Sequence, residues 1–226
     1  MSPYSIIYAD PAWRMNGNHG ELNPAYLTMS DDEIVNLPVA PIACDNSVLL
    51  MWVISSKMDV AIQACKAWGF TYKTIAFVWV KTSKKTGMPN CRLNSYTLSA
   101  VEVCILAMRG KLPKKSHKVK QVIMSPRERH SKKPDEIRNR IVELFGDLPR
   151  IELFARQKTS GWDVWGNEVE SSIRLLTPLA PDGGDSSAQQ ALSTPDMFSA
   201  IEHEPTPAPA GKAYRWADIR SERHHV

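Results

Sequence analysis

The sequence lacks the features that mark membrane, secreted and metal-binding proteins. Its longest apolar runs, such as Ser47 to Ile54, are far too short to cross a bilayer. No charged and then apolar segment with a small-residue cleavage site opens the chain, so nothing points to secretion. The four cysteines among the 226 residues form no C-x-x-C pair and have no nearby histidine, so we expect reduced thiols, no metal site and a cytoplasmic protein.

Lysine and arginine outnumber aspartate and glutamate in the first three-quarters of the chain. Residues 1–170 contain 23 lysines and arginines against 17 aspartates and glutamates, whereas residues 171–226 contain 5 against 7. A basic body favours a polyanionic partner. The densest basic stretch is either a solvated loop or, if it lies beside an active site, a surface that tracks phosphates. Its candidate phosphate-binding residues are Lys114, Lys115, Lys118 and Lys120.

Short apolar runs alternate with helical patterns over residues 1–170. This alternation predicts an α/β fold with a mainly parallel sheet and helices on both faces. In such sheets ligands bind beyond the carboxyl ends of the strands. The expected strands, which are rich in valine, isoleucine and aromatic residues, are Ser5–Ala9, Ser47–Val53, Thr74–Val80, Val101–Ala107, Lys120–Met124 and Arg150–Phe154.

Local signals predict three helices. The segment Ser30 to Glu33 is a capping-box pattern that opens a short helix. A second helix spans Lys57–Trp68 and is stopped by a glycine. The clearest helix spans Pro134–Phe145, with Pro134 at its first position and Gly146 after its end.

The composition changes near residue 171. Residues 175–210 are dense in proline, alanine, serine, aspartate and glycine and show no sustained apolar period, so we expect a flexible linker over residues 171–210. Residues 211–226 form a C-terminal tail that is either a short helix or an interaction segment. We therefore expect one folded domain over residues 1–170, followed by a linker and a tail.

The tetrapeptide Asp10-Pro11-Ala12-Trp13 directly follows an apolar strand. An exocyclic amino group such as N6 of adenine is a poor nucleophile. A carboxylate at a strand end can accept hydrogen bonds from this group and so favour the positive charge that develops on its nitrogen. An indole can stack on an extruded base. The alternative is a simple strand-terminating turn, where aspartate and proline are common.

A second unusual segment spans Arg150–Val169 and joins a strand, a polar loop and another short strand. Such a unit can line a nucleotide pocket, with aromatic and aliphatic walls for the base and with Asn167 and Glu168 for ribose hydroxyls. The alternative is a buried, aromatic-rich hairpin.

Six ordered segments of the chain resemble the messenger-RNA N6-adenosine methyltransferase-like family, whose bacterial and phage members methylate adenine in DNA. The resemblance covers about residues 5–169 and implies a Rossmann-like, S-adenosylmethionine-dependent methyltransferase fold. The matching segments are D-P-A-W (Asp10–Trp13), Y-x-T-M-S-D-D-E (Tyr26–Glu33), L-L-M-W-V (Leu49–Val53), V-W-V-K-T (Val78–Thr82), S-K-K-P-D-E-I (Ser131–Ile137), and R-I-E-L-F-A-R (Arg150–Arg156) with G-N-E (Gly166–Glu168).

The resemblance assigns roles at the target base. It implies that Asp10 and Pro11 hold the target amino group and that Trp13 walls the base pocket. Tyr26 and Glu102 fall at positions that resemble the rim of that pocket. The implied reaction is base flipping followed by direct attack of N6 on the methyl carbon.

The resemblance also assigns the cofactor site. It implies that Asp10 lies near the methionine part of S-adenosylmethionine and that Lys133 pairs with its carboxylate. Arg156 and Asn167 would bind the ribose, and Glu168 stands where the family has another ribose-binding polar residue.

One departure from the family pattern keeps alternatives open. Ala12 stands where the family usually has a second proline. The expected partner is DNA, either a duplex with a flipped adenine or a single strand, in the cytoplasm of a bacterium or of a phage-infected host. RNA as substrate, a catalytically silent nucleic-acid-binding subunit and a homo-oligomer stay open as alternatives.

Overall fold

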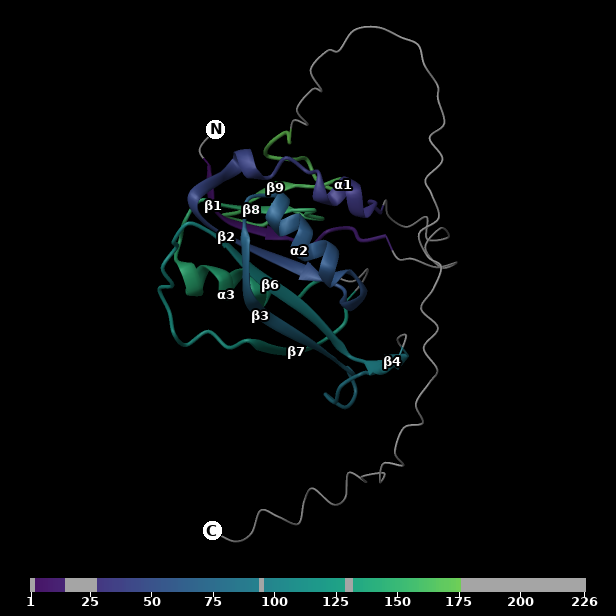
Figure 1. Ribbon diagram of the computed structural model, residues 1–226. Coiled ribbons are helices and arrows are strands. Elements are labelled where there is room, and N and C mark those ends of the chain that lie inside the picture. The colour runs from purple at the N-terminus through teal and green to yellow at the C-terminus, as the bar shows by residue number, and fades with distance from the viewer. Residues whose placement is uncertain (1–2, 15–27, 94–95, 129–131, 176–226) are drawn as a thin grey trace, which may run out of the picture. The chain divides into compact units, whose positions relative to one another are not determined.

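Seven strands form one sheet in the order β7-β3-β6-β2-β1-β8-β9 (Figure 1). β1 is parallel to β2 and β8, the pairs β3–β7 and β8–β9 are also parallel, and β6 runs antiparallel between β2 and β3. This computed structural model describes residues 3–14, 28–93, 96–128 and 132–175, and it confirms the predicted α/β fold with a mainly parallel sheet. The strands of the sheet are β1 (Tyr4–Ala9), β2 (Ala43–Val53), β3 (Thr71–Thr82), β6 (Val101–Arg109), β7 (Val122–Pro126), β8 (Arg150–Leu153) and β9 (Asp163–Trp165).

Helices cover both faces of the sheet, as the alternation predicts. One face carries α1 (Asp31–Val35) and α2 (Met58–Ala67), and the other carries α3 (Glu136–Phe145). Neighbouring residues of β1 therefore belong to different cores: Ile7 packs in the cluster that contains α2, and Ile6 in the cluster that contains α3. None of the helices in the described ranges combines the length and the apolar content that a transmembrane helix needs.

The helix ends follow the local chemistry of the sequence, with one difference. The capping box is present, because the Ser30 hydroxyl accepts from the Glu33 N–H and the Glu33 carboxylate accepts from the Ser30 N–H at 2.6 Å. Gly146 ends α3 with φ of +93°. The difference is at the start of α3, which begins at Glu136 rather than at Pro134. The Pro134 carbonyl accepts from the Ile137 N–H at 3.1 Å, so a tighter turn precedes the α-helix.

The predicted domain boundary at residue 170 falls too early. Ser172 pairs with Val164 of β9, since its N–H donates to the Val164 carbonyl at 2.7 Å and its Oγ accepts from the Val164 N–H at 3.0 Å. Ile173 is only 6% exposed and belongs to the core cluster that contains α2. Residues 171–175 are thus part of the folded domain, and the rest of the predicted linker and tail lies outside the described residues.

A pair of truncations checks this boundary. A chain that ends at Leu175 is expected to keep the free energy of unfolding of the full-length protein. A chain that ends at Glu170 should lose about 1.5–3 kcal/mol, because it loses the burial of one isoleucine side chain. Urea unfolding followed by circular dichroism measures both. Equal stability of the two truncations would show that the Ile173 contact contributes nothing.

Candidate active site

Asp10 lies at the carboxyl end of β1, between two parallel neighbours. Ala9 pairs with Met51 of β2 and Leu153 of β8, and the Asp10 N–H donates to the Leu153 carbonyl at 3.4 Å. The next residue, Pro11, is buried, whereas the Asp10 side chain is 25% exposed. The Met29 N–H donates to the Ala12 carbonyl at 2.9 Å and anchors the turn. The strand end therefore presents one carboxylate at the edge of the sheet.

Lys133 pairs with this carboxylate and links it to a carboxylate on a distant strand. The Lys133 ammonium lies 2.8 Å from Oδ1 and 2.9 Å from Oδ2 of Asp10, and 3.3 Å from Oε2 of Glu102 at the start of β6. Glu102 also pairs with Lys81 near the end of β3. Four charged side chains thus form a continuous row along the carboxyl edge of the sheet.

Charge pairing outweighs burial in this row. Burial disfavours the charged form of Lys133, but the charges of Asp10 and Glu102 prevail and raise its pKa. Burial likewise opposes ionisation of Glu102, yet the Lys133 and Lys81 charges hold its pKa below the ordinary value. Lys133 therefore stays cationic and Glu102 anionic at neutral pH.

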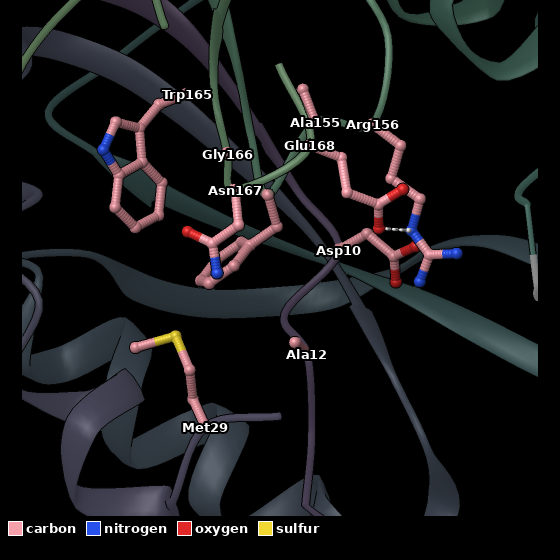
Figure 2. Close-up of a pocket in the computed structure, with 10 residues that line it drawn as sticks. Asp10, Ala12, Met29, Ala155, Arg156, Trp165, Gly166, Asn167 and Glu168 are labelled. Carbon is pink, nitrogen blue, oxygen red and sulfur yellow. Dashed lines mark ion pairs between the residues drawn. The ribbon is translucent and has the colours of Figure 1, made fainter. Parts of the chain in front are cut away.

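Two adjoining cavities open beside Asp10, with volumes of about 240 and 160 Å³. They share Asp10, Phe154, Arg156 and Glu168. Figure 2 shows the larger one, in which the Asp10 and Glu168 carboxylates lie near the Arg156 guanidinium and the Asn167 amide lies between them and Trp165. The Arg156 Nε lies 3.6 Å from Glu168 Oε1. Lys133 and Glu152 line the smaller cavity.

The turn after β8 gives these cavities their shape. Phe154 has φ of +63°, an unusual left-handed conformation for a phenylalanine and a form of strain that is common at functional sites. Its ring packs edge-on against Trp165, with centroids 5.4 Å apart. Gly166 passes so close to this turn that a Cβ there would lie 2.2 Å from the Ala155 carbonyl oxygen. Only glycine fits, and the close contact fixes the loop that carries Asn167 and Glu168.

The site residues predicted from sequence converge in part. Asp10, Arg156, Asn167 and Glu168 line the larger cavity, and Lys133 lines the smaller one. The alternative of a buried hairpin at Arg150–Val169 is wrong, because β8 and β9 are parallel and the segment lines both cavities. The sequence did not single out Met29, Phe154 and Trp165, which form the apolar walls. The composition of Arg150–Val169 predicts aromatic walls for a base, but it does not identify which residues form them.

Other predicted residues lie elsewhere. Trp13 is 8% exposed, donates its indole N–H to the Trp52 carbonyl at 3.1 Å and lines neither cavity, so its predicted contact with a base stays a prediction. Glu102 lies in the row of charges rather than in a cavity wall, and Tyr26 lies outside the described residues. No three histidine, cysteine, aspartate or glutamate side chains gather as metal ligands within the described ranges.

The lysine stretch does not lie beside Asp10, which favours its interpretation as a solvated loop, and its contact with phosphates stays a prediction. Because β6 is antiparallel, it ends at the amino-terminal edge of the sheet, and residues 110–121 start there, opposite Asp10. The Lys115 N–H donates to the Leu144 carbonyl at 2.7 Å, and Arg140 donates to the Lys120 carbonyl at 2.6 Å. The stretch therefore runs along the later part of α3. The candidate phosphate-binding residues of this stretch are Lys114, Lys115, Lys118 and Lys120.

Comparison with known proteins is consistent with this arrangement. A model of the MT-A70 family matches residues 4–168. The chain is 34% identical to the type II methyltransferase M.MunI of Mycoplasma sp, over 77% of this chain and 82% of that protein. It is 31% identical to the N(6)-adenosine-methyltransferase MT-A70-like protein of Drosophila melanogaster and 29% identical to the human N(6)-adenosine-methyltransferase catalytic subunit METTL3. Those matches cover 79% of this chain but only 29% and 30% of the two longer proteins.

Proposed function

This chain belongs to the MT-A70 family of adenine methyltransferases, and we propose that it methylates N6 of adenine in DNA with S-adenosylmethionine as methyl donor. The sheet would then be the Rossmann-like core of such enzymes, with the reaction at its carboxyl edge. The observation that carries the proposal is the convergence of Asp10, Lys133 and the Asn167–Glu168 loop on two adjoining cavities.

The residues of the site fit the proposed methyl donor. Its methionine part carries an ammonium and a carboxylate, and Asp10 and Lys133 present the complementary charges side by side. The Asn167 and Glu168 side chains suit ribose hydroxyls, and Phe154 and Trp165 offer apolar surface for an adenine ring. When bound, S-adenosylmethionine would supply an electrophilic methyl group.

Asp10 would supply the electrostatic contribution to the reaction. Its carboxylate can accept a hydrogen bond from the target amino group and so stabilise the positive charge that develops on that nitrogen. The Pro11 carbonyl would accept the second amino hydrogen. Lys133 holds both Asp10 oxygens, so it also orients the carboxylate. An adenine within a duplex must leave the stack to reach Asp10, at a cost of a few kcal/mol.

The coverage of the related proteins favours DNA as the substrate. The chain spans 82% of the type II methyltransferase, against less than a third of the N(6)-adenosine-methyltransferases. Its body is also basic, as a polyanionic partner requires. We place its action in the cytoplasm of a bacterium or of a phage-infected cell.

Mass spectrometry of nucleosides tests the function directly. Purified protein is incubated with S-adenosylmethionine and either unmethylated plasmid DNA or an RNA transcript of the same sequence, and each product is digested. We expect N6-methyldeoxyadenosine from the DNA. Methylation of the RNA alone would reassign the substrate. A product from neither nucleic acid would favour a catalytically silent subunit.

Lys133→Ala is expected to weaken S-adenosylmethionine binding more than DNA binding. Loss of a charge-assisted hydrogen bond should cost about 1.5–3 kcal/mol of cofactor affinity. Isothermal titration calorimetry measures the cofactor affinity, and fluorescence anisotropy measures the DNA affinity. Lys66→Ala is the control, because Lys66 is an exposed lysine of α2 that lines neither cavity. Equal cofactor affinity of wild type and Lys133→Ala would remove Lys133 from the site.

A further inference from the structure

The connection between β3 and β6 exposes several apolar side chains to solvent. It contains a two-stranded hairpin, β4 (Arg92–Leu93) and β5 (Leu98–Ser99), in which Leu93 pairs directly with Leu98. Leu93 is 87% exposed, Leu98 67% and Tyr96 99%, while residues 94–95 lie outside the described residues. Apolar residues gathered in one exposed place commonly mark a binding surface.

This hairpin lies on the same edge of the sheet as Asp10. β3 runs in the same direction as β1, so the connection from β3 to β6 starts at the carboxyl edge of the sheet. Figure 1 shows β4 beyond the ends of β3 and β6. At its base the Lys81 N–H donates to the Ala100 carbonyl at 2.7 Å. The row of charges from Lys81 through Glu102 and Lys133 leads from that base to Asp10.

A basic groove lies beside the hairpin. It has a volume of about 380 Å³ and is lined by Lys84, Arg92 and Arg127, together with a single carboxylate, Glu128. Glu128 is itself paired with Lys132 at 3.2 Å. The groove thus has three cationic side chains and one carboxylate that is already paired, and it lies next to the exposed leucines. This combination suits a ligand that offers both phosphates and stacked bases.

We propose that the β4–β5 hairpin is a wedge that enters a DNA duplex at the target site, while Lys84, Arg92 and Arg127 hold the flanking phosphates. The inference rests on the proposed function and extends it. Proteins that unstack base pairs insert leucine-like side chains between base steps. Leu93 and Leu98 would occupy the space that an extruded adenine leaves, and their burial there would offset the cost of extrusion.

A second copy of the chain is the other occupant that an apolar hairpin suggests. In a symmetric dimer the same patch lies on both sides of the interface, so two hairpins would bring two basic grooves together. Like charges in an interface oppose association. Charge complementarity therefore favours DNA.

The double variant Leu93→Ser with Leu98→Ser tests the wedge on two duplexes. One carries the target adenine opposite thymine, and the other carries it opposite an abasic site, where no base pair must open. We expect kcat/KM to fall by about tenfold or more on the paired duplex, which is the effect of losing about 1.4 kcal/mol, and by less than about twofold on the unpaired one. The fluorescence of 2-aminopurine at the target position should also rise less than with wild type.

Controls separate the wedge from other causes. Tyr72→Ser with Val122→Ser removes two exposed apolar side chains away from the hairpin and should alter neither substrate's rate. Tyr96→Ser repeats the test independently if the double variant fails to fold. An equal loss on both duplexes would overturn the wedge, as would a wild-type dimer that the double variant converts to monomer. No methylation of either duplex by wild type would instead refute the proposed function.

Salt dependence tests the basic groove. Replacing Lys84, Arg92 and Arg127 with alanine should lower the magnitude of the log–log slope of DNA affinity against salt by about 0.9 for each phosphate that the variant no longer neutralises. The comparison is a variant in which the four lysines at the opposite edge of the sheet become alanine. A larger change of slope for that variant would overturn the assignment of the groove. The four lysines are Lys114, Lys115, Lys118 and Lys120.

Discussion

Asp10→Ala should lower the rate of methyl transfer by about 100-fold or more, the usual effect of removing one preorganised electrostatic interaction from a reaction centre. The side chain lies at the end of β1, partly exposed, where it can meet a target amino group. Its loss removes the proposed acceptor and one of the two carboxylates that hold Lys133. Single-turnover transfer of labelled methyl groups to DNA measures the effect without a contribution from product release.

Two further variants show whether the carboxylate itself matters. Asp10→Asn keeps the size of the side chain and one acceptor oxygen but loses the charge, so we expect most of the loss to remain. Asp45→Ala removes an aspartate that is 96% exposed at the amino end of β2, and its rate should match wild type. Near-normal transfer by Asp10→Ala, in a protein with unchanged circular dichroism, would refute the mechanism.

Glu152→Ala should lower the free energy of unfolding by about 3–5 kcal/mol, because it leaves a buried charge without its main partner. Glu152 accepts from Nε and Nη2 of Arg138, each at 2.7 Å, and both side chains are at most 10% exposed. Burial disfavours the charge on Arg138, but the hydrogen bonds and charge of Glu152 prevail and raise its pKa. Urea unfolding at neutral pH measures the loss.

A double variant and an exposed pair serve as comparisons. Arg138→Met with Glu152→Leu removes both charges together and should be far less destabilising than Glu152→Ala alone, since no charge is left buried and unpaired. Glu136→Ala breaks an ion pair with Arg140, and the Glu136 carboxylate is half exposed. This variant should lose less than about 1 kcal/mol of the free energy of unfolding. A loss for Glu152→Ala no larger than for Glu136→Ala would show that burial adds nothing to this pair.

Local patterns in the sequence predicted most elements of the fold and the position of the candidate reaction centre along the chain. Apolar runs predicted six of the seven sheet strands, because a strand buried on both faces needs a continuous apolar segment. Ser30 with Glu33 set the start of α1 and Gly146 the end of α3, because these signals act over a few residues. Aspartate after the first strand placed the candidate reaction centre, because strand ends define the ligand edge of such sheets.

Which distant charges pair depends on how the strands and helices pack together. Lys133 pairs with Asp10, 123 positions away in the sequence, and also with Glu102 of another strand, and nothing local predicts either contact. An apolar strand pattern does not show whether β6 runs parallel or antiparallel to its neighbours. The sequence therefore could not predict that β6 is antiparallel and that the lysine stretch after it starts at the edge opposite Asp10. Trp13 and Arg138 show the same limit, because burial of an indole or a guanidinium depends on partners that other elements supply. Strand direction and side-chain pairing are properties of the packed sheet, whereas element type and chemical motif are local.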